Sequence, residues 1–326
     1  MLREFIVLSS IRGRIKGLSM MNKSMFFIGV VLLLLWQLMP LGTKDAIASS
    51  AVLSDRTEDL GAGLYAFRSD EHRSFFLVST EGVIVVDPLN ASAAKAMRQE
   101  ITKLSAQPVK YVAYTNSFYD RSSGGNIFKE EGATFIAHED CAVELTETPN
   151  PDVVIPDITF QADYTITLGN KTLDLHHYGP SYGLCFTVAV AGPANTMILS
   201  DIITPPNASL PRDPTIANYN LYALMDFFGQ VDALVNRSNI ENVAAGYAPL
   251  GKGYASTSPV SIIFEQRRFW AVLLDEVEVQ YNKKLPARVI PERMDMSRFK
   301  GFGGFEPKYI KIMSRRVYSL YRIGRR

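Results

Sequence analysis

Cysteine and histidine are both scarce in this sequence of 326 residues, which contains two cysteines and four histidines. The cysteines, Cys141 and Cys185, do not form a Cys-x-x-Cys pair, and two of them in a chain of this size exclude a disulfide scaffold. In an oxidising compartment they could pair if the fold brings them together. We favour the simpler interpretation that they are two buried free thiols.

An excess of charge of one sign is also missing, because the net charge of the whole chain is +1. Nothing in this overall charge indicates a nucleic-acid partner. The average hides two basic ends. Residues 1–48 contain six Lys or Arg and two acids, a net charge of +4, and residues 288–326 contain 11 Lys or Arg and three acids. With 47% hydrophobic and 21% charged residues, the composition is that of a globular protein.

The N-terminal part contains an uncharged apolar run of 17 residues, 25–41, with basic residues before it and Ala46-Ile47-Ala48 after it. These are the parts of a secretory signal peptide. A retained membrane anchor is the alternative, since 17 residues is the lower limit for crossing a bilayer. Because positive residues stay in the cytoplasm, both interpretations predict that the rest of the chain is exported to the periplasm or another extracytoplasmic space.

Periodicity predicts alternating strands and helices after residue 48. We expect strands at 63–69, 73–80, 82–88, 109–114, 134–138, 163–168, 172–177, 184–191, 196–203 and 241–247, and helices at 92–105, 218–236 and 260–281. Two runs of strands, each followed by helices, indicate a layered α/β protein, an αββα sandwich. We therefore divide the chain into residues 1–48 (signal peptide or single anchor), 49–285 (the sandwich domain) and 286–326 (a basic, aromatic C-terminal extension).

Four segments occur in order and are informative together: residues 82–88 (GVIVVDP), 114–125 (YTNSFYDRSSGG), 175–182 (LHHYGPSY) and 198–203 (ILSDII), followed by Ala-Gly-Tyr at 245–247. With this order and spacing the chain resembles the metallo-β-lactamase superfamily. The resemblance implies an αββα fold whose loops, in the family, bind one or two zinc ions through five histidines and two aspartates. Fold resemblance alone does not establish an activity.

The zinc ligands of the family are mostly replaced in this chain. Asn116, Phe118, Arg121, Tyr182 and Tyr247 stand at the five histidine positions, and only Asp120 and Asp201 remain. Zinc prefers imidazole and thiolate ligands, and an arginine that stays protonated repels a cation. We therefore expect these seven residues to form a vestigial pocket with no metal, no cofactor and no assigned catalytic residue.

The remaining aspartates need a new counter-charge if they are buried, because an unpaired buried charge costs several kcal/mol. Arg121 is the candidate. Our hypothesis is that its guanidinium pairs with Asp120 or Asp201. Two catalytic alternatives stay open, acid–base chemistry by Tyr182 with Asp201 and nucleophilic chemistry by Cys185, although no base for the thiol is evident.

The four histidines, His72, His138, His176 and His177, do not supply the missing ligands by their spacing. Neighbours on a strand point to opposite faces, so His176 and His177 cannot serve one ion from the same strand. We expect ordinary hydrogen-bonded or surface histidines. A zinc site with two histidines elsewhere in the fold is the alternative.

These features favour a non-catalytic protein that acts as a binding or scaffold subunit at the outer face of the membrane. Its partners would be the membrane surface or integral membrane subunits, because residues 298–326 interleave aromatic and basic side chains. A solvated tail, or a helix packed on its own domain, is the simpler interpretation of that segment. The alternative functions are a hydrolase with an altered or absent metal site, and a protein that binds a small ligand in the old cleft.

Overall fold

The computed structural model describes Ser54 and residues 56–203, 218–247, 255–303 and 305–324. The apolar run 25–41 and the possible cleavage site therefore lie outside the described residues. Residues 52–326 form one compact unit. None of the helices within the described ranges combines the length and the apolar character that a membrane span requires.

The first half of this unit builds a seven-stranded sheet whose strands follow their order in the sequence. The strands are β1 (Thr57–Gly61), β2 (Leu64–Ser69), β3 (His72–Val78), β4 (Val83–Val86), β5 (Val109–Ala113), β6 (Thr134–His138) and β7 (Ile158–Phe160). Pairing is antiparallel from β1 to β4 and parallel from β4 to β7. The parallel strands are separated by helical crossovers, as parallel pairing requires.

The second half builds a six-stranded sheet in the order β13-β12-β11-β10-β9-β8. Its strands are β8 (Asp163–Leu168), β9 (Lys171–His177), β10 (Thr187–Gly192), β11 (Thr196–Leu199), β12 (Asn242–Ala245) and β13 (Thr257–Pro259). Only β11 and β12 pair in parallel. The two strands expected at 163–168 and 172–177 form an antiparallel hairpin, with β8 and β9 paired on either side of Gly169.

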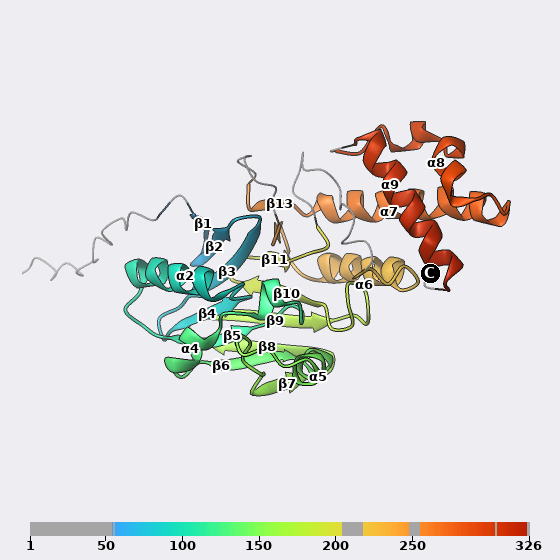
Figure 1. The fold of residues 1–326 in the computed structure, drawn as a ribbon. Helices are drawn as coiled ribbons and strands as arrows, with labels where there is room; N and C mark the ends of the chain where they lie inside the picture. Colours follow the sequence, from blue (N-terminus) through green and yellow to red (C-terminus); the bar gives the residue numbers. More distant parts are fainter. Residues whose placement is uncertain (1–53, 55, 204–217, 248–254, 304, 325–326) are drawn as a thin grey trace, which may run out of the picture. The chain divides into compact units, whose positions relative to one another are not determined.

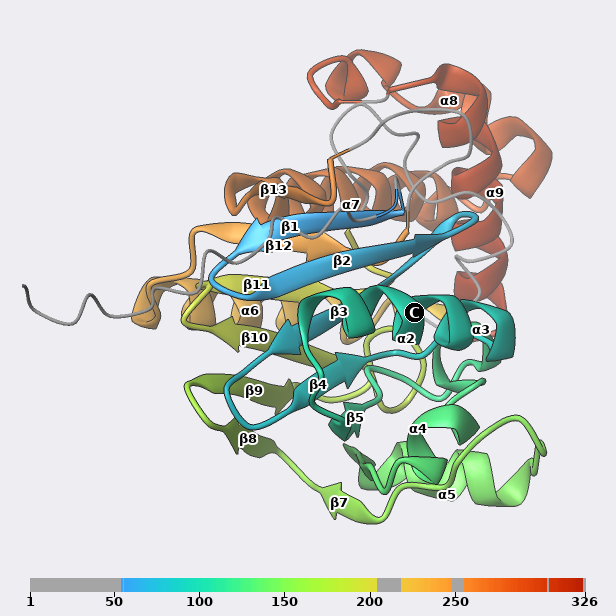
Figure 2. The ribbon, with the colours of Figure 1, turned by 90° about the vertical axis from the view of Figure 1, so that its left-hand side faces the viewer.

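Helices cover the outer face of each sheet, and the core is divided into three layers. On the first sheet lie α2 (Ala91–Leu104), α4 (Asn126–Glu130) and α5 (Glu139–Glu147), and Figure 2 shows α2 across the strands. Leu64, Phe75, Leu173 and Leu175 belong to the layer between the sheets. The second sheet is covered by α6 (Leu224–Arg237), α7 (Ser261–Asn282) and α9 (Pro307–Arg322). This arrangement confirms the predicted αββα sandwich.

Residues 286–326 contribute to the same core as the second sheet. They form two short 3₁₀ turns (Ala287–Val289 and Met296–Phe299), α8 (Ile290–Arg293) and α9, which lie together with α7 (Figure 1). Phe299, Phe302, Tyr318 and Tyr321 are buried in one cluster with side chains of α6 and α7. The aromatic residues of this segment are thus largely core residues, which agrees with the interpretation of a helix packed on its own domain.

The favoured interpretation of the two cysteines was wrong, because Cys141 and Cys185 form a disulfide with their Cα atoms 5.3 Å apart. Cys141 lies in the first turn of α5, which follows the carboxyl end of β6, and Cys185 precedes β10. The two positions are 44 residues apart, one on the helix after a strand of the first sheet and the other just before a strand of the second. Sequence spacing alone could not show that the sandwich brings these two loops together.

Candidate functional site

The expected pocket residues come from loops that follow the ends of several strands. Residues 114–118 follow β5 and lead into the short helix α3 (Tyr119–Ser122), which carries Asp120 and Arg121. Asp201 follows β11, and Tyr247 follows β12. Because parallel strands end at the same edge of a sheet, the residues that follow β11 and β12 lie side by side.

Arg121 is completely buried, and every N–H of its guanidinium has an acceptor. Its Nη2 lies 2.6 Å from Asp201 Oδ1 and 3.2 Å from the Ser200 carbonyl oxygen. Its Nη1 donates to the carbonyl oxygens of Arg73 and Gly246 at 3.1 and 3.0 Å, and its Nε donates to the Asp201 carboxylate at 3.2 Å. A Cβ at Gly246 would lie 2.5 Å from the Ser200 carbonyl oxygen, so this close approach requires glycine.

The predicted ion pair of Arg121 is therefore confirmed, with Asp201 as the partner. Burial acts to lower the pKa of Arg121, but the charge and hydrogen bonds of Asp201 outweigh it and raise that pKa above its ordinary value. The second carboxylate oxygen of Asp201 accepts a hydrogen bond from Asn116 Nδ2 at 2.7 Å. Both oxygens of Asp201 are thus already used by side chains at two positions where the family resemblance implies histidine.

Asp120 has a different partner, which the sequence did not indicate. Its Oδ2 lies 3.1 Å from His72 Nε2, at the start of β3. Burial acts to raise the pKa of Asp120, yet the hydrogen bond from His72 and the charge of Arg121 hold it below its usual value. Tyr247 meets the same histidine, through an isolated backbone bridge and an edge-to-face ring contact of 6.3 Å.

Aromatic rings fill the other side of the pocket. Tyr182 is buried and packs edge to face against Phe118 at 5.4 Å and Tyr219 at 4.9 Å. Its hydroxyl accepts a hydrogen bond from Asn218 Nδ2 at 3.3 Å. Burial and the nearby charge of Asp201 raise the pKa of Tyr182 to about 12. The phenol is therefore protonated at neutral pH and is a poor general base.

A further carboxylate, Asp87, lies under the pocket and was missed as a site residue. It is fully buried and accepts hydrogen bonds from the Thr115 N–H at 2.8 Å, the Thr115 hydroxyl at 2.6 Å and the Ser200 hydroxyl at 2.8 Å. Burial raises the pKa of Asp87 to about 6, although Arg121 and the hydrogen bonds act against this. An acid directly after an apolar strand was the signal that could have found it.

The pocket does not fit the zinc ions that the family resemblance implies. A cation held by Asp120 and Asp201 would have to displace the Arg121 guanidinium, which is buried with its charge and all its donors satisfied. Asn116 and Phe118 offer zinc no imidazole. The seven expected residues do lie in one region. There they form the Arg121–Asp201 ion pair, a pair between Asp120 and His72, and an aromatic cluster.

A cleft of about 420 Å³ opens beside this region. It is lined by Ser117, Phe118, Tyr119, Glu144, Leu145, Glu147 and Thr148. Only Phe118 among the seven expected residues lines it. Asn116, Tyr182 and Tyr247 are not among its walls.

Sequence comparison gives no match to a protein-family model or to a curated protein. Solved structures do match. A metallo-β-lactamase from Pontibacter korlensis is 14% identical, with a TM-score of 0.57 over 66% of this chain and 98% of its own. The DIM-1 metallo-β-lactamase is 12% identical, with a TM-score of 0.54 over 66% and 96%.

A third similar structure is the stereoselective inverting sec-alkylsulfatase Pisa1 from Pseudomonas sp. It is 14% identical, with a TM-score of 0.64 over 81% of this chain and 50% of its own. Identities this low carry no information on activity, but the three TM-scores, all above 0.5, show that the fold is shared. The chain has the metallo-β-lactamase fold.

Proposed function

We propose that this chain is a non-catalytic protein with a metallo-β-lactamase fold, which acts as a binding or scaffold subunit at the outer face of a membrane. The observation that carries the proposal is the Arg121–Asp201 pair. A buried cation of the protein stands among the residues that replace the zinc ligands, and its partner is one of the two retained aspartates. Hydrolysis that depends on a metal-activated water has no source there.

Export is supported by two independent features. The first 48 residues have the order of a signal peptide or anchor, with a basic start and an apolar run. The disulfide between Cys141 and Cys185 adds to this, because disulfides persist mainly in oxidising compartments.

Contact with a membrane or a membrane subunit is supported by the outer side of α9. Lys308, Arg315, Arg316 and Arg322 are exposed there, whereas the apolar side of the helix is buried in its own domain. Such a helix would dock through its charges, since each cation near an anionic surface contributes about 1 kcal/mol. Ile312, in the first half of α9, and Ile323, directly after its last residue, are also exposed and would add apolar contact.

The non-catalytic part is tested with purified full-length chain and added Zn²⁺ or Mn²⁺. We expect no turnover of β-lactam, carboxylic ester or sulfate ester substrates above that of the Asp201→Asn variant. Metal-dependent turnover that is lost in Asp201→Asn would overturn the proposal. Export is tested separately by fusing alkaline phosphatase after residue 326, and an inactive fusion protein retained in the cytoplasm would contradict it.

A second candidate function is the binding of a small cation, and the cleft lined by Phe118, Tyr119, Glu144 and Glu147 favours it. Aromatic faces and carboxylates together attract ammonium groups. Titration with tetramethylammonium, followed by intrinsic fluorescence, tests this for the wild type and for Glu147→Gln. Saturation in the wild type only is the expected result, and identical curves would reject the idea.

A further inference from the structure

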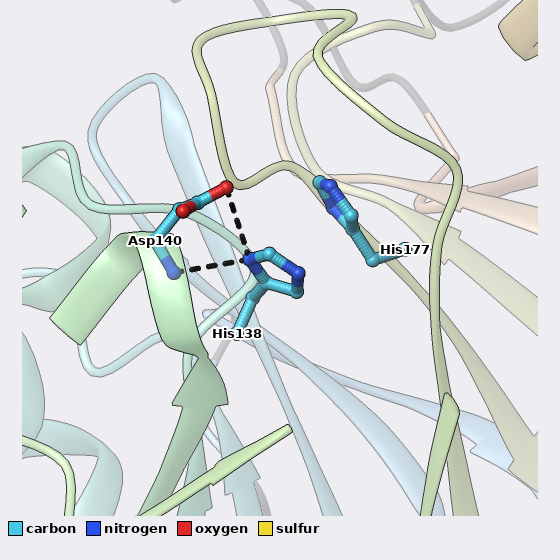
Figure 3. A group of neighbouring side chains, drawn as sticks. All are labelled: His138, Asp140 and His177. Atoms are coloured by element: carbon cyan, nitrogen blue, oxygen red, sulfur yellow. Dashed lines mark hydrogen bonds and ion pairs between the residues drawn. The ribbon is translucent and has the colours of Figure 1, made fainter. Parts of the chain in front are cut away.

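Three side chains outside the vestigial pocket converge at one end of the sandwich. His138 ends β6, Asp140 lies in the first turn of α5, and His177 ends β9 (Figure 3). One ligand atom from each of the three lies within 4.8 Å of the others. We propose that His138, Asp140 and His177 bind a divalent first-row transition metal ion, with Zn²⁺ as the natural candidate.

The hydrogen bonds of both imidazoles leave one ring nitrogen of each able to act as a ligand. His138 Nε2 lies 2.7 Å from the Gln161 carbonyl oxygen, so this nitrogen carries the proton and Nδ1 carries a lone pair. His177 Nδ1 lies 3.1 Å from the Phe186 carbonyl oxygen, so its Nε2 is the unprotonated nitrogen. Donation of the other N–H to a backbone carbonyl is the usual arrangement around metal-binding histidines, because it fixes the ring and its tautomer.

The carboxylate of Asp140 completes the group from the solvent side. Its Oδ2 lies 3.6 Å from His138 Nδ1, and its side chain is half exposed, whereas the ring of His138 is 4% exposed. The backbone N–H of Asp140 also donates to His138 Nδ1, at 3.2 Å, and a metal ion on this nitrogen would take the place of that bond. Water can reach the remaining coordination positions from the exposed side.

The two imidazoles are stacked, with ring centroids 3.7 Å apart, which disfavours a positive charge on both rings. Neutral imidazole is the form that binds metals. A pair of imidazoles with one carboxylate suits zinc, nickel or cobalt better than magnesium or calcium, which prefer oxygen ligands.

The ion would link the two sheets, since β6 belongs to the first and β9 to the second. The Cys141–Cys185 disulfide joins α5 to the loop before β10 at the same end of the domain. A metal ion at this place therefore adds a second cross-link between the sheets. It uses none of the seven residues of the vestigial pocket, so it is compatible with a non-catalytic protein.

The test is a titration of chelator-treated full-length chain with Co²⁺, followed by its visible d–d absorption, and with Zn²⁺ in competition with a chromophoric chelator. We expect one ion per chain. His177→Gln and Asp140→Asn should each weaken binding about 100-fold or more, since even the loss of a second-sphere partner costs 10-fold to 100-fold. His176→Gln is the matched control: it is the next residue on β9 and pairs with Asp163, and it should bind like the wild type.

A second readout guards against misfolded variants. Zinc should raise the melting temperature of the wild type and of His176→Gln but leave those of His177→Gln and Asp140→Asn unchanged, and Asp140 is exposed enough for its variant to fold. Absence of a 1:1 complex in the wild type would overturn the proposal. So would equal binding by His177→Gln and His176→Gln, or binding that is lost in Asp201→Asn, which would place the ion in the other pocket.

Discussion

Arg121 and Asp87 set the electrostatics of the pocket at the scale of single residues. The guanidinium of Arg121 is held by one carboxylate and three backbone carbonyl oxygens, and the charge of Asp87 lies close enough to affect its pKa. A buried pair of this kind contributes little net stability, but loss of one partner leaves an uncompensated charge and costs about 3–5 kcal/mol. The guanidinium therefore links α3 to Arg73 of β3 and to the residues that follow β11 and β12.

Asp87 makes stability depend on pH in a defined direction. Its pKa is raised to about 6 in the folded chain, whereas an unfolded aspartate titrates near ~4. Between these pH values the folded state therefore binds more protons than the unfolded state. The stabilisation of the folded state by protonated Asp87 is complete below pH ~4 and is lost as the pH rises through about 6. The loss amounts to ~3 kcal/mol for two pKa units.

Urea unfolding of the wild type and of Asp87→Asn at several pH values measures this effect. Asparagine tolerates the positive φ of 58° at this position and cannot ionise. The stability of the wild type relative to the variant should fall between pH 4 and pH 6 and then level off. The other carboxylates are present in both proteins, so their contributions cancel in the difference in unfolding free energy. A difference that stays constant across this pH range would contradict the assignment.

The seven pocket residues show which part of a site can be predicted from a sequence. That Arg121 pairs with Asp120 or Asp201 was predicted from charge, because a buried carboxylate needs a partner, but the choice of Asp201 came only from the structure. The pairing of Asp120 with His72 did not follow, since His72 comes from β3 and no local pattern connects it to α3. The His138–His177 contact was likewise not predictable from a local pattern, because the two residues belong to strands of different sheets.

At the scale of elements, the disulfide holds α5 against the loop before β10. A cross-link that closes a loop of 44 residues stabilises by about 4 kcal/mol if chain entropy dominates. We expect the Cys141→Ala/Cys185→Ala double variant to lose between ~2 and ~4 kcal/mol of unfolding free energy, measured in guanidinium chloride. The wild type with reductant should unfold like the double variant, and a reductant-insensitive wild type would show that the bond does not form.

Strong periodicity predicted elements well, and short or irregular elements escaped it. The long helix α7 and the hairpin of β8 and β9 lie within one or two residues of the expected bounds. The helix expected at 218–236 begins only at Leu224, because Tyr219 is held in a bridge to Tyr182. Strands β1, β7 and β13 have three to five residues and little apolar pattern of their own, so their pairing partners define them.

At the scale of the whole molecule, the pocket is separate from the layer between the two sheets, although Tyr182 belongs to the core cluster that the second sheet shares with its helices. The apolar layer between the sheets contains none of the seven pocket residues. A fold of this size buries enough apolar surface to persist without the ion. The two layers of helices and the loops can therefore change function independently of the sheets.

The packing of the C-terminal segment on the domain can be tested with two isoleucines of α9. Ile310 is 1% exposed and lies in the core shared with α6 and α7, whereas Ile312, two residues on, is 40% exposed. Ile310→Ala should lower the free energy of unfolding by about 2–5 kcal/mol, because it removes buried methyl groups and leaves a cavity.

Ile312→Ala is the matched control and should change stability by less than about 1 kcal/mol, since it removes the same atoms from a partly solvated position. Both variants are compared by urea unfolding with a single transition followed by tryptophan fluorescence, because Trp270 of α7 lies in the same core. Equal effects of the two substitutions would mean that α9 does not pack on the domain. A loss confined to Ile310→Ala would make residues 307–322 part of the folding unit and leave only their basic outer side for a partner.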